Sequence, residues 1–185
     1  MSTKKKKNID IVDIPENVEV EIDGNMMKFK GQKGTLEKKF LYPSIKISRE
    51  NNAIKLEPVK KYTKKEKRMI KTFKSHIKNC IIGVTEGFSY HLRIVSGHFP
   101  MSVVLEHNKI VIKNFLGEKF PRIAQVHSHV KAVIKGDDIT IEGIDKEATG
   151  QSAANLETAT RITNRDRRRF QDGIYITQKP ERHKK

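Results

Sequence analysis

The alternation of apolar and polar residues predicts a series of strands in the first part of the chain. Residues 18–22 read Val-Glu-Val-Glu-Ile, which is the period of two expected of a strand with one buried face. An Asp-Gly-Asn turn follows, and residues 26–30 then have the pattern of a returning hairpin strand. Further strands are predicted at residues 36–41, 45–48 and 53–57.

Beyond residue 62 the apolar residues recur about every four positions, which is the spacing of a helix face. Thr63 and Glu66 form a Thr-x-x-Glu capping box, a signal for the first turn of a helix. The buried face of this helix is predicted to carry Met69, Phe73, Ile77 and Ile81. The first half of the chain therefore predicts several strands followed by one helix.

The second half of the chain repeats this order of elements. Strand-like residues 102–106 and 110–113 correspond to the first hairpin at a constant offset of 83 positions. The strand around residues 139–141 matches residues 54–56 at an offset of 85. A second helix is predicted at about residues 145–163. Its buried side is predicted to carry Ala148, Leu156, Ala159 and Ile162, with Ala153 and Ala154 close to the sheet.

A repeat of this length is too long for a solenoid and indicates a duplicated domain. We predict an α+β fold of two tandem similar domains, each an antiparallel β-sheet packed against one α-helix, with basic terminal tails. The predicted parts are an N-terminal tail at 1–8, domains at 9–86 and 87–178, and a C-terminal tail at 179–185.

One segment of the second domain has no counterpart in the first. It is predicted to consist of a basic loop at residues 165–170, a tight turn at Asp172-Gly173 and a short strand at residues 174–176.

Positive charge is concentrated in a few segments. The chain has 38 Lys and Arg residues against 22 Asp and Glu, a net charge of +16, which indicates a polyanionic partner. All of the excess lies in residues 1–7, 58–79 and 161–185, and the rest of the chain is close to neutral. Segregated charge of this kind is typical of a set of phosphate contacts, so RNA is the leading interpretation.

Two of these segments supply candidate RNA-contact residues. The helix near residues 63–79 is rich in Lys and Arg and has Glu66 as its one acidic residue. Solvated helix faces, in contrast, usually mix Glu with Lys. A solvated face and an acidic membrane surface are the alternatives for this helix. The loop contains three consecutive arginines, whose side chains stack on bases and bind phosphate, and a flexible tail without a defined partner is the alternative there. The candidates are Lys64, Lys67, Arg68 and Lys71 in the helix, and Arg165, Arg167, Arg168, Arg169, Lys179, Arg182, Lys184 and Lys185 in the loop and tail.

No arrangement typical of catalysis, cofactor binding or metal binding is predicted. His127 and His129 lie two apart on a predicted strand and would share one face, but no third ligand lies at a standard spacing. Cys80 is the single cysteine, which favours a reducing compartment. His98 is expected to be structural or to lie near RNA. No apolar run is long enough to span a bilayer.

Several short segments, in a fixed order, resemble the ribosomal protein uL6 family. They are Gly-Gln-Lys-Gly-Thr-Leu from Gly31, residues 77–90, His-Phe-Pro from His98, Asn-Phe-Leu-Gly-Glu-Lys from Asn114, Ile-Glu-Gly from Ile141, Gln-Ser-Ala-Ala from Gln151 and Asp-Gly-Ile-Tyr-Ile from Asp172. Each segment is weak alone, but their order and spacing are specific. Those that begin at His98, Asn114 and Asp172 are similar to the eukaryotic type, the 60S protein L9.

The resemblance implies a structural, non-enzymatic protein that binds large-subunit rRNA near the sarcin–ricin loop and the factor-binding region. It also implies neighbouring 60S ribosomal proteins as partners, translation factors nearby, and a second domain that serves as the main anchor. The expected location is the cytoplasmic ribosome, with nuclear or nucleolar assembly, and neither a membrane nor a small-molecule substrate is expected. A non-ribosomal RNA-binding or RNA-processing protein is the alternative, and so is a peripheral membrane protein.

Overall fold

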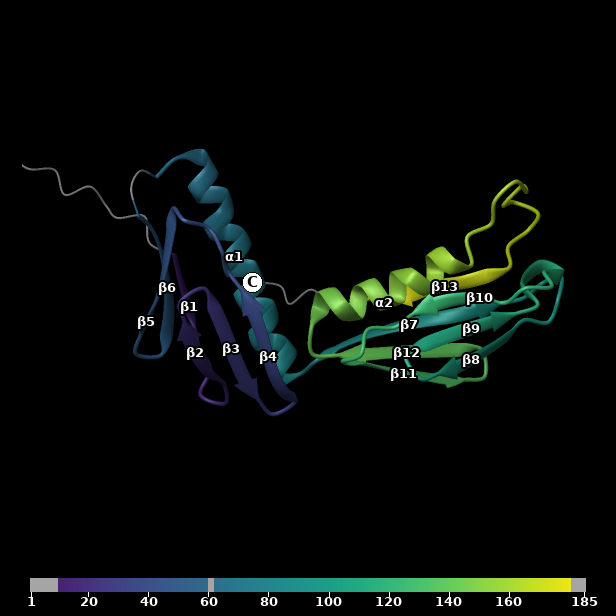
Figure 1. Cartoon of the computed structure of the whole chain (residues 1–185), viewed down its shortest axis with the longest axis horizontal. Helices are drawn as coiled ribbons and strands as arrows, with labels where there is room; N and C mark the ends of the chain where they lie inside the picture. Colours follow the sequence, from purple (N-terminus) through teal and green to yellow (C-terminus); the bar gives the residue numbers. More distant parts are fainter. Residues whose placement is uncertain (1–9, 60–61, 181–185) are drawn as a thin grey trace, which may run out of the picture. The chain divides into compact units, whose positions relative to one another are not determined.

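The computed structural model describes residues 10–59 and 62–180, and the chain divides into two compact units between Glu86 and Gly87. Unit 1 precedes this boundary and unit 2 follows it. Each unit combines antiparallel sheets with one long α-helix (Figure 1). The predicted fold class, two tandem α+β domains, is therefore confirmed.

Unit 1 contains two three-stranded antiparallel sheets that share one helix. The first sheet has the order β1 (Asp10–Asp13), β6 (Ala53–Pro58) and β5 (Ile45–Glu50). The second has the order β2 (Glu19–Asp23), β3 (Met26–Gly31) and β4 (Gly34–Lys39). Helix α1 (Lys64–Thr85) packs against strands of both sheets, so its apolar face closes a single core.

The buried face of α1 includes the predicted Phe73, Ile77 and Ile81, but it begins at Ile70 and not at Met69. Ile70 is fully buried, whereas Met69 is only half-buried. Steps of four residues advance about 400° around a helix and so drift about 40° per step, while mixed steps of three and four keep to one side. The buried side chains are Ile70, Phe73, Ile77, Cys80, Ile81 and Val84. The predicted capping box is confirmed, because the Thr63 hydroxyl accepts the Lys65 N–H and the Glu66 carboxylate accepts the Thr63 N–H.

Unit 2 has the same plan with one additional strand. A four-stranded antiparallel sheet has the order β11 (Val130–Lys135), β12 (Asp138–Gly143), β7 (Phe88–Val95) and β13 (Gly173–Gln178). A three-stranded sheet contains β8 (Ser102–Glu106), β9 (Lys109–Lys113) and β10 (Arg122–Gln125), with a short helical turn η1 (Phe115–Gly117) before β10. Helix α2 (Lys146–Ala159) packs against both sheets.

The predicted repeat is confirmed by the strands themselves. β8 and β9 begin 83 residues after β2 and β3, and β11 and β12 begin 85 residues after β5 and β6. β7 occupies the place of β1, because β1 pairs with β6 and β7 pairs with β12, the strand equivalent to β6. β13 adds to the free side of β7 and has no counterpart in the described part of unit 1, as predicted.

The second helix is predicted correctly in part: Leu156 is buried as predicted, but the helix ends earlier than residue 163. α2 ends at Ala159, because the Thr160 hydroxyl bonds the carbonyl of Leu156 and accepts the N–H of Ile174 from β13. Ile162 is buried beyond the helix end. The buried side chains of α2 are Thr149, Ser152, Ala153 and Leu156, whereas Ala148, Ala154 and Ala159 are half-buried.

Two further predictions about turns and strands need correction. His127 and His129 lie in the turn between β10 and β11, so they do not share a strand face. The tight turn is not at Asp172-Gly173 but earlier, where the N–H groups of Arg169 and Phe170 bond the Asp166 carbonyl. Asp172 instead uses its carboxylate to hold a neighbouring loop. Among the strands, β1, β7, β10 and β11 were not predicted.

Candidate RNA-contact surfaces

Helix α1 presents a basic face on the side opposite its buried residues. Its candidate contact residues Lys64, Lys67, Arg68 and Lys71 are all exposed. Within residues 10–59 and 62–180 none of these four forms an ion pair, whereas Lys74 pairs with Asp10 of β1 at 2.9 Å. The carboxylate of Glu66 is used at the helix start, where the Thr63 hydroxyl hydrogen-bonds to it and lowers the pKa of Glu66. This face therefore offers cations that the carboxylates of the described residues do not neutralise.

The second surface is the arginine loop, which we define as residues 163–172 between α2 and β13. Arg165, Arg167, Arg168 and Arg169 are all exposed. The Arg165 guanidinium lies 5.0 Å from the centre of the Phe170 ring. Arg168 pairs with Asp166 at 3.0 Å, and this hydrogen bond lowers the pKa of Asp166. In the described part of the chain Arg167 and Arg169 have no acidic partner. The guanidinium groups of Arg165 and Arg168 are therefore engaged within the loop, whereas those of Arg167 and Arg169 are available to bind a partner.

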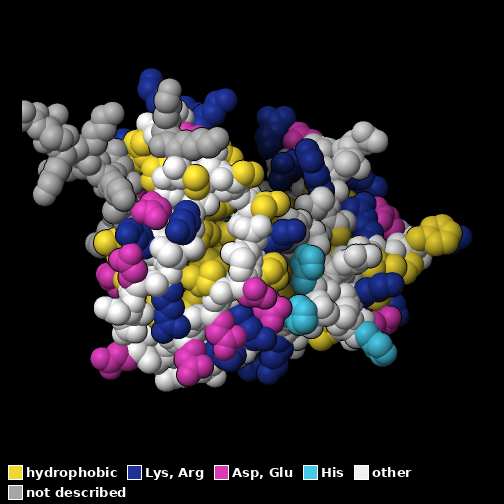
Figure 2. Space-filling model, turned by 60° about the vertical axis from the view of Figure 1, so that its left-hand side comes forward, with side chains coloured by type: hydrophobic (Ala, Val, Ile, Leu, Met, Phe, Trp, Pro, Cys, Tyr) yellow, Lys and Arg dark blue, Asp and Glu magenta, His cyan; other side chains and the backbone are white. Residues whose placement is uncertain are grey.

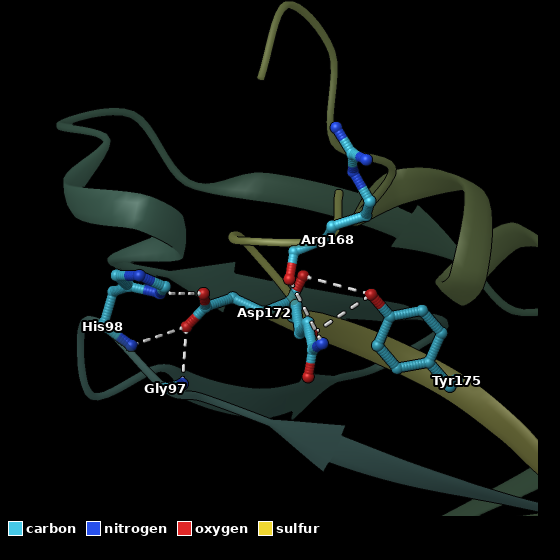
Figure 3. A network of polar contacts seen from close by, with 6 residues as sticks. Gly97, His98, Arg168, Asp172 and Tyr175 are labelled. Carbon is cyan, nitrogen blue, oxygen red and sulfur yellow. Dashed lines mark hydrogen bonds and ion pairs between the residues drawn. The ribbon is translucent and has the colours of Figure 1, made fainter. Parts of the chain in front are cut away.

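A buried carboxylate ties the arginine loop to the loop between β7 and β8 (Figure 3). The Asp172 Oδ1 atom accepts the N–H groups of Gly97 at 2.6 Å and His98 at 2.9 Å. The Oδ2 atom lies 2.6 Å from His98 Nδ1. A carboxylate only accepts hydrogen bonds, so Nδ1 carries a proton. Burial raises the pKa of Asp172, but the hydrogen bonds from His98 and Gly97 outweigh it, and the net pKa is lowered.

Ring contacts complete this attachment. The His98 ring stacks on Phe170, with centroids 4.7 Å apart. The Tyr175 hydroxyl donates to the Gln171 carbonyl at 3.2 Å. The side chain of Arg168 points away from this network, as Figure 3 shows. The base of the arginine loop is therefore held in place by the fold, while its guanidinium groups face outward. His98 has a structural role, which is one of the two roles predicted for it.

The remaining candidates lie at the C-terminal end. Lys179 follows β13 and is exposed. Arg182, Lys184 and Lys185 lie outside the described residues, as do residues 1–8 of the predicted N-terminal tail. On the face drawn in Figure 2, Asp and Glu side chains lie among the Lys and Arg side chains. The cationic face of α1 and the arginine loop differ from that mixed surface.

Other kinds of site find little support in the structure. Residues 10–59 and 62–180 contain no group of three or more His, Cys, Asp or Glu side chains that could hold a metal ion. No helix of this described part is both long and apolar enough to cross a membrane. Cys80, the single cysteine, is buried in the core of unit 1.

The two units each match the same protein family. The sequence model described as ribosomal protein L6 matches residues 14–87 and again residues 99–173, once in each unit. Curated relatives extend over most of the chain. The large ribosomal subunit protein uL6 of Methanobrevibacter smithii is 51% identical over 168 residues, which are 91% of this chain and 94% of the relative. The protein of the same name from Methanosarcina mazei is 47% identical, over 91% and 95% of the two chains.

A duplicated α+β fold with basic surfaces and this family match define a ribosomal protein that has a structural role and no enzymatic one. The chain belongs to the ribosomal protein L6 family, uL6. These two relatives come from archaea, whereas the sequence motifs predicted the eukaryotic type in particular.

Proposed function

We propose that this chain is a structural protein of the large ribosomal subunit that binds large-subunit rRNA through two separate basic surfaces. The arginine loop and the residues after β13 form the main anchor, and the basic face of α1 is a second contact. The position that we propose is near the sarcin–ricin loop and the factor-binding region, with neighbouring ribosomal proteins as partners and translation factors close by. Residence in cytoplasmic 60S particles, after nucleolar assembly, stays a prediction.

The observation that carries this proposal is the attachment of the arginine loop. Asp172 and the His98–Phe170 stack hold the base of the loop, while Arg167 and Arg169 remain exposed, with no acidic partner among the described residues. Because the base of the loop is held in this way, its backbone loses little conformational freedom when the arginine side chains bind phosphate.

The test compares two double variants that remove the same charge. Arg167→Ala with Arg169→Ala removes the two available guanidinium groups, and Lys131→Ala with Lys135→Ala removes two exposed cations of β11. Binding to transcribed large-subunit rRNA is measured over a range of salt concentrations. The arginine variant should bind more weakly, and its salt slope should fall by about 0.7–0.9 for each phosphate group that it no longer binds.

The lysine variant should keep both its affinity and its salt slope. An equal decrease of affinity in both variants would contradict the arginine loop as anchor and would indicate a general effect of net charge. Failure of the unmodified chain to bind the rRNA saturably would contradict RNA binding itself. A third variant, Lys67→Ala with Lys71→Ala, measures the contribution of α1 in the same assay, and we expect a smaller decrease there.

A further inference from the structure

Phe120 is a large apolar residue that is almost fully exposed to solvent. Its ring is 84% exposed, whereas Leu41, the next most exposed large hydrophobic side chain in the described residues, is 58% exposed. Phe120 lies in the loop between β9 and β10, which also contains η1. An isolated ring in this position adds little to the core, and aromatic side chains are enriched at binding interfaces relative to the rest of the surface.

The loop that carries Phe120 is fixed on both sides. Arg122 donates to the Glu118 carboxylate through Nη2 at 2.6 Å and Nε at 2.8 Å. The same guanidinium donates to the carbonyl of Ala159 at the end of α2, and it lies 4.2 Å from the centre of the buried Phe115 ring. Both ends of the segment from Glu118 to Arg122 are therefore fixed by these contacts. The loop backbone then loses little conformational entropy when a partner binds.

The backbone before Phe120 adopts unusual angles. Asn114 and Leu116 have φ values of 60° and 49°, and Gly117 has a φ of 78°. A branched side chain such as that of Leu116 rarely takes a positive φ, and such strain concentrates at binding and active sites. The Asn114 side chain donates to the Pro100 carbonyl at 3.0 Å, and the Phe99 ring lies against Gly117. The loop is thus tied to the segment that also holds Asp172.

The surroundings of Phe120 are cationic. The loops before β8, between β9 and β10, and before β13 lie at one end of unit 2 (Figure 1). Lys119 is exposed beside Phe120, and the nearby carboxylate of Glu118 is paired with Arg122. Hydrogen bonding from Arg122, supplemented by the charge of Arg165, lowers the pKa of Glu118, so the arginine loop lies within electrostatic reach.

An exposed ring among cations fits unpaired RNA better than it fits an apolar protein socket. A base offers a flat π-face to the ring, and the phosphates on either side of that base need positive charge. We propose that Phe120 is a stacking platform for one unpaired base of large-subunit rRNA, with Lys119 beside the adjacent phosphates. This inference rests on the proposed function and adds a nucleobase contact to the phosphate contacts of the arginine loop.

The chain contains no tryptophan, so Phe120→Trp introduces a single tryptophan, whose emission can be excited selectively over that of the four tyrosines. Stacking on a base should quench its emission when transcribed large-subunit rRNA is added. The matched control is Leu105→Trp, which replaces a side chain that is 40% exposed near the opposite end of the β8–β9 hairpin. Its emission should stay unchanged at the same RNA concentration.

Affinity measurements complete the test. Phe120→Ala should weaken rRNA binding by about 5- to 100-fold, the range expected when one base–aromatic stack is removed. Phe120→Tyr should bind like the unmodified chain. The salt slope of Phe120→Ala should not change, because no phosphate contact is removed, which separates this contact from that of Arg167 and Arg169.

Four results would overturn the stacking platform. Unmodified affinity in Phe120→Ala, or unquenched emission of the RNA-bound Phe120→Trp chain, would refute stacking and leave the proposed function intact. A blue shift that occurs only when purified large-subunit proteins are added would assign Phe120 to a protein socket. Failure of the unmodified chain to bind rRNA would refute the proposed function and this inference together.

Discussion

Replacing Asp172 by alanine tests whether one buried carboxylate holds the arginine loop on unit 2. The side chain is 4% exposed and accepts three hydrogen bonds, two from backbone N–H groups and one from an imidazole. Hydrogen bonds to charged groups contribute about 1.5–3 kcal/mol each. Gly97 and His98 lie at the surface, where water can replace part of this stabilisation. We therefore expect the free energy of unfolding of unit 2 to fall by about 2–4 kcal/mol.

Native-state hydrogen exchange, followed by mass spectrometry, measures this decrease separately in each unit. Amides of β13 and β7 should lose protection in Asp172→Ala, while amides of α1 in unit 1 should not change. Asp172→Asn should lie between the alanine variant and the unmodified chain, because its amide oxygen still accepts N–H groups. The matched control is Asp166→Ala, which removes an exposed carboxylate of the same loop and should leave β13 protected.

A decrease below about 0.5 kcal/mol in unit 2 would refute the reasoning, since it would mean that water satisfies all three donors. An equal decrease of protection in α1 would also refute it, because the effect would then not be local to the arginine loop.

Two further predictions concern pH and packing. The pKa of Asp172 lies below its ordinary value of 3.8, so the stabilisation is full above about pH 4 and disappears as the pH falls through the folded-state pKa. The difference in β13 protection between the unmodified chain and Asp172→Ala should therefore shrink as the pH falls below about 4; a difference that persists undiminished in strongly acidic solution would contradict the assignment. Gly31→Ala would place a Cβ atom 2.6 Å from the Val84 carbonyl oxygen, so it should destabilise unit 1 by about 1–3 kcal/mol in urea unfolding. Gln32→Ala, in the same turn and exposed, should have almost no effect, and equal destabilisation in both variants would exclude the Val84 clash as the cause.

Much of the fold follows from local patterns in the chain. The period of two in residues 19–23 and the change to helical spacing after Thr63 identify the first hairpin and α1 without any tertiary information. The constant offset between β2 and β8 reveals the duplication, because homologous copies keep the lengths of their strands and turns. The family resemblance and the α+β class follow from the same local order.

Strands with weak alternation could not be predicted in this way. β11 reads Val-Lys-Ala-Val-Ile-Lys, so its apolar and polar residues alternate irregularly and a period of two does not stand out. β7 does alternate from Phe88 to Ile94, so its pattern was present in the sequence and was missed. The predicted face of α1 was wrong only at its first position, Met69 in place of Ile70, because fixed four-residue steps ignore the drift around the helix.

The composition and order of residues were sufficient to predict a duplicated α+β protein with cations gathered on one helix and one loop, since these properties depend on neighbours in the chain. The contact of Asp172 with Gly97 and His98 joins residues 75 and 74 positions apart, so it exists only where β13 lies beside β7. Arg122 likewise reaches the carbonyl of Ala159 at the end of α2, 37 positions away. Such contacts are set by the packing of distant segments, because burial and hydrogen-bond geometry are properties of the folded chain and not of any short stretch of it.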